Sequence, residues 1–135
     1  MISFNYETDF KLENESQISS WISDTIQKED FKEGDINYIF CDDAYLHKLN
    51  MDFLQHDTLT DIISFDYCVG KELHGDIYIS TERVTENAKE FEVDVSEELA
   101  RVMIHGILHY CGYKDKTALE LKTMRAKENE HLSAR

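Results

Sequence analysis

The strongest constraint on the fold of this chain is a segment at about residues 96–110 that has the length of a helix and almost no polar face. Asp94 or Ser96 can cap its start, and Gly112 is a natural stop. A helix that is apolar on nearly every side must be enclosed by other elements. The sequence therefore predicts a central, buried helix against which the rest of the chain packs.

Segments with strand and helix periodicity alternate irregularly along the rest of the chain. Predicted strands cover residues 2–6, 36–40, 62–65 and 76–79, and predicted helices cover about 14–29, a segment after Asp42 or Asp43, a segment opened by Thr81, and about 117–132. Because no regular βαβ rhythm emerges, we expect an α+β fold with a mixed sheet of about four strands packed with helices. The chain has no proline, low-complexity stretch or repeat to mark a linker, so we expect residues 1–135 to form a single domain.

Local patterns within these segments give three further expectations. Gly34 and Asp35 should punctuate the chain ahead of the second strand. The apolar side chains of the helix after Asp43 should be Leu46, Leu49 and Phe53. Those of the helix opened by Thr81 should be Val84, Ala88 and Phe91.

The composition is that of a folded protein, because 41% of the residues are hydrophobic and 31% are charged. No apolar run approaches the ~20 residues that a membrane-spanning helix needs, and the first residues lack the basic-then-apolar pattern of a secretory signal. Cys41, Cys68 and Cys111 show no C-x-x-C spacing and are expected to be reduced thiols. We therefore expect a cytoplasmic protein without a membrane partner.

The charge of the chain is distributed unevenly. Its net value of −14 argues at first against a nucleic-acid partner, because phosphate contacts need local positive potential. Residues 101–135, however, contain seven Lys/Arg against four Asp/Glu, a net of +3, which leaves −17 on the other hundred residues. The basic residues therefore gather in the same part of the chain as its closely spaced histidines, so an RNA partner stays open.

His105 and His109 lie four residues apart on the predicted buried helix, so both imidazoles project from one face. Gly112 permits a sharp turn, after which Asp115 can return a carboxylate to the same point. The pattern H-x-x-x-H-x-x-G-x-x-D has the spacing of the metzincin zinc motif, with aspartate in place of the third histidine. Two histidines and a carboxylate leave a fourth position for water, as in catalytic zinc sites. We therefore predict one zinc ion per chain, with its bound water as the nucleophile.

The residue after the first histidine discriminates between reactions. Metalloproteases of this layout carry a glutamate there as general base, whereas this chain has Gly106. Peptide hydrolysis is therefore less favoured, unless Glu120 or Glu128 reaches the site from the last helix. A phosphodiester substrate suits the metal better, because its hydrolysis needs a Lewis acid, a nucleophile and cations around the phosphate.

Residues 105–113, HGILHYCGY, closely resemble the signature of the YbeY family, the bacterial metallo-endoribonucleases of ribosomal RNA maturation. Three further stretches are similar to the family pattern and follow its order. They are Leu49-Asn50 with Asp57 and TDIISF at 60–65, GDIYIS at 75–80, and the spaced Glu120, Met124 and Glu128 of the closing helix. The resemblance spans about residues 49–128.

This resemblance implies a zinc-dependent, single-strand-specific endoribonuclease that acts in maturing the 3′ end of the small-subunit (16S) ribosomal RNA and in ribosome quality control. It also implies a cytoplasmic location and contact with the small ribosomal subunit, and it leaves the oligomeric state open. Two alternatives remain. One is a metallopeptidase with a metzincin-like motif, and the other is a non-catalytic ribosome-associated factor whose metal is structural.

The chain departs from the family pattern at the metal loop and at one arginine. The family usually has a histidine where this chain has Asp115, and an aspartate where it has Lys114. The anionic ligand lowers the charge of the site by one, so the metal should be a weaker Lewis acid. Leu54 stands where the family places an arginine thought to help with RNA, and Leu59 where it has a proline, which leaves open whether catalysis is weakened. We nominate Lys114 and Lys116 as the cations that contact RNA instead.

Several other polar residues have both a functional and a structural interpretation. Asp61 and Ser64 are candidate RNA contacts, although a loop cap and a strand backbone partner are the simpler interpretations. Tyr110 and Tyr113 are expected to pack against the sheet rather than to stack on a base. The side chains assigned to the surface are His47, His56, His74, His131, Glu128 and Glu130.

Overall fold

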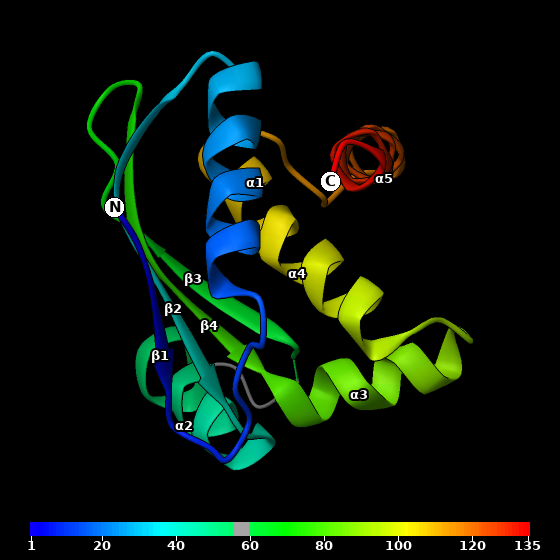
Figure 1. The fold of residues 1–135 in the computed structure, drawn as a ribbon. Coiled ribbons are helices and arrows are strands. Elements are labelled where there is room, and N and C mark those ends of the chain that lie inside the picture. Colours follow the sequence, from blue (N-terminus) through cyan, green and yellow to red (C-terminus); the bar gives the residue numbers. More distant parts are fainter. Residues whose placement is uncertain (56–59) are drawn as a thin grey trace.

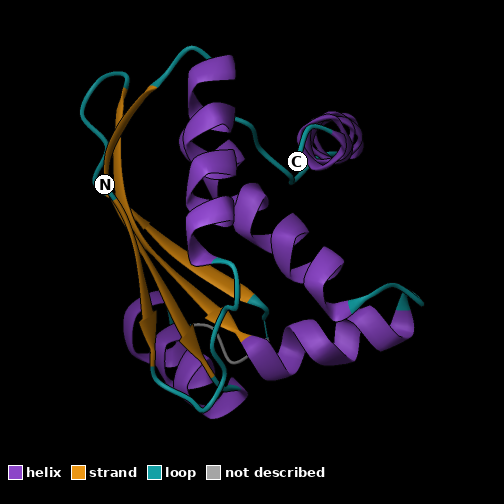
Figure 2. Cartoon of the chain, in the orientation of Figure 1, coloured by secondary structure: helices purple, strands orange, loops and turns teal. Residues whose placement is uncertain are grey.

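The computed structural model describes residues 1–55 and 60–135 (Figure 1). Within these ranges a four-stranded sheet packs with five helices (Figure 2), in the order β1 (Ile2–Tyr6), α1 (Glu15–Lys28), β2 (Lys32–Cys41), α2 (Asp43–Leu54), β3 (Ile62–Asp66), β4 (Glu72–Ser80), α3 (Thr81–Glu90), α4 (Val95–Tyr110) and α5 (Ala118–Ser133). The predicted α+β class and four strands are confirmed. His56, Asp57 and Leu59 lie outside the described residues. No helix in the described ranges is long and apolar enough to span a membrane.

The sheet is mixed, as the sequence predicts. Its strand order is β1-β2-β4-β3, with β1, β2 and β4 parallel and β3 antiparallel to β4. Parallel neighbours need a crossover connection, and α1 provides it between β1 and β2. β3 and β4 instead form a hairpin that turns at Gly70, whose φ is +59°. This arrangement makes β3 an edge strand.

The two faces of the sheet are covered by different helices. Alternate side chains of β2 and β4 point to opposite faces. One set, including Tyr38, Phe40 and Ile77, joins a large core with residues of α1 and α4. A smaller cluster of Cys41, Leu46 and Ile63 forms under α2. α5 lies beyond α1 and α4, on their side away from the sheet, where Figure 1 shows it almost end-on.

α4 is the central helix that its apolar sequence predicts. Ten of its residues are buried, among them Met103, Ile104 and Ile107. It contacts α1, α3, α5, β3 and β4, and the Tyr38 hydroxyl donates a hydrogen bond of 2.9 Å to the Met103 carbonyl. The helix is therefore fixed from several sides, which gives the side chains at its C-terminal end a rigid base.

The expectation that Gly34 and Asp35 punctuate the chain is wrong, because both lie inside β2. The pairing of β2 with β4 shifts register between Glu33 and Ile36, so β2 carries one extra residue there, as in a β-bulge. A Cβ on Gly34 would lie 2.4 Å from the Leu73 carbonyl oxygen. The glycine therefore allows close approach of the backbones inside a strand rather than a turn before it.

Two phenylalanines assigned to the apolar faces of helices are exposed. Phe53 lies in the last turn of α2 and is 66% exposed, with its ring packed edge-on against Phe65 at a centroid distance of 5.9 Å. Phe91 follows the last residue of α3, so the helical periodicity no longer directs its side chain to the core, and it is 56% exposed. Both phenylalanines thus lie at the C-terminal end of their helix, where more than half of each residue is exposed.

Candidate metal centre

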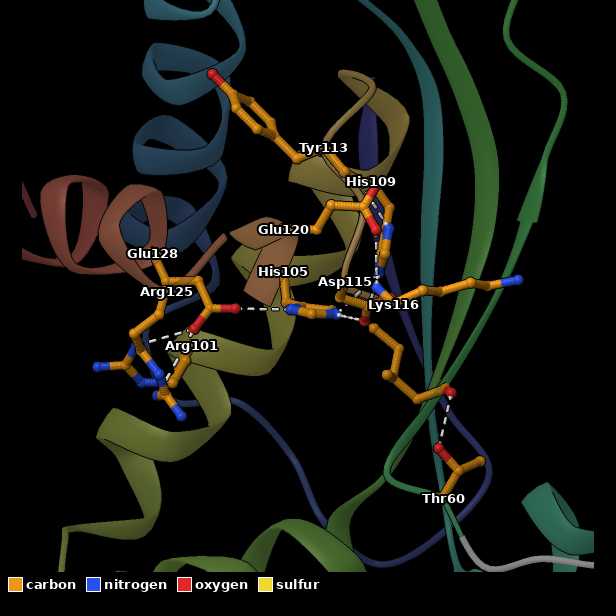
Figure 3. Close-up of polar contacts among 11 residues, drawn as sticks. Thr60, Arg101, His105, His109, Tyr113, Asp115, Lys116, Glu120, Arg125 and Glu128 are labelled. Carbon is orange, nitrogen blue, oxygen red and sulfur yellow. Dashed lines mark hydrogen bonds and ion pairs between the residues drawn. The ribbon is translucent and has the colours of Figure 1, made fainter. Parts of the chain in front are cut away.

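The end of α4 and the following loop bring the three predicted ligands together. His105 and His109 project from the same face of α4 (Figure 3). Gly112 has a φ of +100°, where a residue with a Cβ would be strained, and the N–H groups of Gly112 and Tyr113 each donate to carbonyls of the last helical turn at 3.0 Å. This tight helix end returns the chain so that Asp115 lies beside both histidines.

The three side chains offer ligand atoms to one point. The Nε2 atoms of His105 and His109 lie 2.9 Å apart, and Oδ2 of Asp115 lies 3.2 Å from each of them. Ligand atoms that share one zinc ion at ~2.1 Å lie roughly 3–3.5 Å from one another. The donor set and its spacing therefore fit a single zinc ion. All three side chains are partly exposed, so a ligand of the ion can reach it from solvent.

The remaining ring nitrogens have protein partners. Nδ1 of His105 lies 2.6 Å from Oε2 of Glu128, and Nδ1 of His109 lies 3.0 Å from the Tyr113 carbonyl. Partners of this kind hold each Nδ1 as the N–H donor and leave Nε2 as the free electron-pair donor. Burial alone would lower the pKa of His105, but the Glu128 hydrogen bond and the charges of Glu128 and Asp115 outweigh it and raise the pKa.

The interpretation of Glu128 as a solvated residue is wrong. Only 5% of it is exposed, and its carboxylate bridges His105 and Arg101, whose Nη1 donates at 2.9 Å. Burial opposes its ionisation, but these two hydrogen bonds lower the pKa of Glu128 overall. A signal was present in the sequence, because Met124, Glu128 and His131 recur at helical spacing and share the buried face of α5.

A cleft of about 300 Å³ opens beside His105 and Asp115. Its walls come from α3, α4 and α5 and from the start of β3, where Asp61 and Ile62 lie. Burial raises the pKa of Asp61. Arg101 and Arg125 contribute the guanidinium groups of the wall. The cleft thus joins the predicted ligands to both a carboxyl group and cations.

The comparisons with known proteins decide the family. The model of the family described as endoribonuclease YbeY matches residues 2–135. The chain belongs to the YbeY endoribonuclease family. Two relatives with this name, from Flavobacterium johnsoniae and Flavobacterium psychrophilum, are 60% identical over 133 residues and 61% identical over 132 residues. Each alignment covers 98% of this chain, with 96% and 94% of the respective relatives.

A solved member of the same fold confirms the architecture. The solution structure of TM1509 from Thermotoga maritima superposes with a TM-score of 0.70 at 28% identity, over 98% of this chain and 87% of that one. Membership of the YbeY family supports a nuclease of the hydrolase class. The resemblance stated from residues 49–128 therefore extends over nearly the whole chain.

Two arginines lie beside the centre of this YbeY family member in addition to the two lysines nominated from the sequence. Lys114 and Lys116 are exposed on the metal loop, and the Lys116 side chain extends away from the histidines in Figure 3. Leu54, at the position of the family arginine, is exposed at the end of α2. Arg101 and Arg125 line the cleft, and sequence reasoning missed them because only the fold brings α4 and α5 together beside it. Ser64 is exposed on edge strand β3.

A metallopeptidase of this layout would need a glutamate at position 106, where this chain has a tightly packed glycine. A Cβ on Gly106 would lie 3.1 Å from Cδ1 of Ile77 and 3.2 Å from Cδ1 of Ile62, so this position packs directly on the sheet. Glu120 does not replace it, because its carboxylate caps the N-terminus of α5 in a capping box with Thr117. Glu128 contacts Nδ1 of His105, away from the converging Nε2 atoms.

The other residues singled out from the sequence have structural partners. Tyr110 is buried and donates to the Phe65 carbonyl at 2.9 Å, as packing against the sheet predicts. The surface assignment of His131 is wrong, since it is 1% exposed and its Nε2 lies 2.6 Å from Oε2 of Glu29. His47 and His74 are half-buried, and Glu130 is exposed. The three cysteines are free thiols.

Proposed function

We propose that this protein is a zinc-dependent, single-strand-specific endoribonuclease that matures the 3′ end of small-subunit ribosomal RNA and acts in ribosome quality control. One observation carries the proposal: in a member of the YbeY endoribonuclease family, His105, His109 and Asp115 converge at a cleft lined by arginines. The proposal places the protein in the cytoplasm, in contact with the small ribosomal subunit.

The metal would be held by Nε2 of His105, Nε2 of His109 and Oδ2 of Asp115. A zinc ion bound by three protein ligands supplies a Lewis acid for a phosphoryl oxygen and lowers the pKa of a coordinated water. Glu128 and the Tyr113 carbonyl keep the two imidazoles oriented through their Nδ1 atoms. These partners reduce the reorganisation needed when a substrate arrives.

The chain's own charges would position the RNA. Arg125 is exposed at the cleft and makes only a long ion pair with Glu128, at 3.7 Å, so it keeps N–H donors for a phosphate. Arg101 is largely occupied by Glu128 and Asn129. Lys114 and Lys116 remain proposed phosphate contacts of the metal loop. Asp61 and Ser64 remain proposed contacts to the ribose, where a carboxylate or hydroxyl can accept a hydrogen bond from the 2′-hydroxyl. A cleft of about 300 Å³ favours an unpaired nucleotide over a duplex.

Purified protein incubated with single-stranded RNA and, separately, with casein tests the class of reaction. We expect RNA fragments that disappear with a chelator and with His109→Ala, while His47→Ala, on the other side of the sheet, retains activity. Peptide products would favour a metallopeptidase. A protein that binds small ribosomal subunits but yields no products from either substrate would favour a non-catalytic ribosome-associated factor.

Immature small ribosomal subunits test the proposed substrate. We expect the wild-type protein to shorten the 3′ end of their RNA, as mapped by sequencing of the RNA ends, and His109→Ala to leave it unchanged. Cleavage of free RNA with intact precursor ends would contradict the proposed role in maturation and leave the nuclease activity standing.

A further inference from the structure

One wall of the cleft contributes none of the three candidate metal ligands. It is formed where α3 ends and α4 begins, and it carries Phe91 and Glu98, while Arg125 faces it from α5. Phe91 is 56% exposed and Glu98 is 7% exposed. An exposed aromatic ring and a buried carboxylate thus line the same cavity as His105 and Asp115.

Glu98 is a largely buried residue whose carboxylate lines the cleft. Across residues 1–55 and 60–135, its side chain has no hydrogen-bond or ion-pair partner. Burial and the nearby charge of Asp61 raise the pKa of Glu98. Neither oxygen of Glu98 is among the fully enclosed, unpaired polar atoms of the described residues, so the carboxylate opens to the cleft and can accept hydrogen bonds from a ligand with N–H donors.

Phe91 is held in place by the helix end that precedes it. Its N–H donates to the Asn87 carbonyl at 2.9 Å, and Glu92, with a φ of +56°, turns the chain so that Val93 donates to the Ala88 carbonyl at 3.0 Å. The backbone is therefore fixed although the ring is exposed. An aromatic ring of this kind can stack on a nucleobase at a low entropic cost.

We infer that this wall is a nucleobase subsite, in which an unpaired base stacks on Phe91 and directs its N–H edge at Glu98. Guanine fits best, because its N1–H and N2–H lie side by side and match the two oxygens of a carboxylate. Arg125 neutralises the adjacent phosphate. A paired base has its N–H edge occupied, so the subsite admits single strands only. This inference rests on the proposed function and specifies the nucleotide beside the cleavage site.

A second metal ion explains this wall less well than a base does. Within the described residues, Glu98 belongs to no group of three side chains whose ligand atoms lie within 4.8 Å of one another. Arg101 and Arg125 also line the cleft with Glu98, so guanidinium groups lie where a second cation would have to bind. A donor that is neutral, such as a base, meets no such repulsion.

Kinetics on matched substrates test the subsite. We would measure kcat and KM for single-stranded RNAs that carry guanosine or inosine, which lacks the 2-amino group, beside the cleavage site. We expect the wild type to favour guanosine by about ten-fold in kcat/KM. Phe91→Ala should raise KM about ten-fold with little change in kcat, and Phe91→Trp should restore it. Glu98→Gln should abolish the preference for guanosine over inosine.

Matched variants and a direct titration complete the test. Phe53→Ala removes another exposed ring, from α2, and Glu97→Gln changes the exposed neighbour of Glu98, so both variants should behave as wild type. Zinc content should be equal in all variants. Wild-type KM and a wild-type guanosine preference in Phe91→Ala and Glu98→Gln would overturn the subsite and leave the nuclease intact.

If the wild type cleaves no RNA, the proposed function fails, and a direct titration decides the subsite. Tighter binding of guanosine 5′-monophosphate than of inosine 5′-monophosphate supports the subsite, and equal binding overturns it.

Discussion

Glu128 makes two contacts that link the candidate metal centre to the rest of the molecule. It holds Nδ1 of His105 at 2.6 Å and receives Nη1 of Arg101 at 2.9 Å. Carboxylates in this position fix the tautomer and orientation of a metal-binding imidazole. Arg101 in turn fixes the carboxylate, because its second nitrogen donates to Asn129 on α5 at 2.8 Å. The orientation of His105 therefore depends on the packing of α5 against α4.

Glu128→Gln should lower the affinity for zinc about 10–100-fold and leave the fold intact, because glutamine keeps the shape of the side chain and loses the charge. Competition with a chromophoric chelator measures this affinity. Glu130→Gln, two residues along and exposed, is the control and should match the wild type. Equal zinc affinity in wild type and Glu128→Gln would show that the contact to His105 does not matter for the metal.

At the level of single residues, the sequence predicts contacts that are short in sequence separation. His105, His109 and Asp115 fall within one helix end and its loop, so their spacing alone indicates that they meet. Glu128 is 23 residues from His105, and Glu29 is 102 residues from His131. Such pairs depend on how α5 packs, and the polar sequence of α5 gives only a weak sign of its buried face.

A cluster centred on Glu29 joins three elements behind the metal loop. Its Oε1 accepts from the Tyr113 hydroxyl at 2.7 Å, and its Oε2 lies 2.6 Å from Nε2 of His131 and 3.5 Å from Nζ of Lys127. The end of α1, the metal loop and α5 thereby share one buried carboxylate. Burial would raise the pKa of Glu29, but the hydrogen bonds from Tyr113 and His131 lower it overall.

Glu29→Gln should reduce the free energy of unfolding by about 2 kcal/mol at pH 7, the range of a hydrogen-bonded charged group. Because the folded pKa lies below the unfolded value of ~4.3, this contribution is complete above that value and is lost as the pH falls through the folded pKa. Urea unfolding at several pH values between 7 and 3, with chelator throughout, should show the two proteins converge at low pH. Asp30 is an exposed neighbour, and Asp30→Asn should change the free energy of unfolding little. If the difference in unfolding free energy between wild type and Glu29→Gln stayed constant with pH, the charge of Glu29 would not be the source of the stabilisation.

At the level of elements, the types and order of helices and strands were predictable, and several of their limits were not. The apolar sequence of α4 predicts its central place, because a helix without a polar face must be surrounded by other elements. Gly34 gives the same local signal in a bulge as in a turn, so β2 was predicted four residues too short at its start. Phe91 fits the periodicity of α3 but lies beyond its end, where that periodicity no longer applies.

For the whole molecule, the net charge of −14 would repel RNA, so binding depends on where the cations lie. Affinity for single-stranded RNA should fall as salt rises. Arg125→Ala should make the dependence of log affinity on log salt shallower by about 0.7, the value for one phosphate contact on a single strand. Lys48→Ala, on α2 across the sheet, should leave the slope unchanged. Fluorescence anisotropy with labelled RNA measures both, and an unaltered slope in Arg125→Ala would remove that residue from the interface.

The zinc dependence of RNA cleavage is best tested by comparing metal-stripped wild type and Asp115→Ala side by side, on single-stranded RNA over a range of free zinc concentrations. We expect the wild type to be inactive in chelator and to regain full activity at one zinc ion per chain. Asp115→Ala should need more than ~10-fold higher free zinc. Loss of a residue that only hydrogen-bonds to a metal ligand already lowers metal affinity by about that factor, and Asp115 is proposed as a ligand itself. Cleavage by the wild type that persists in chelator, or the same zinc requirement for both proteins, would contradict the proposed zinc site.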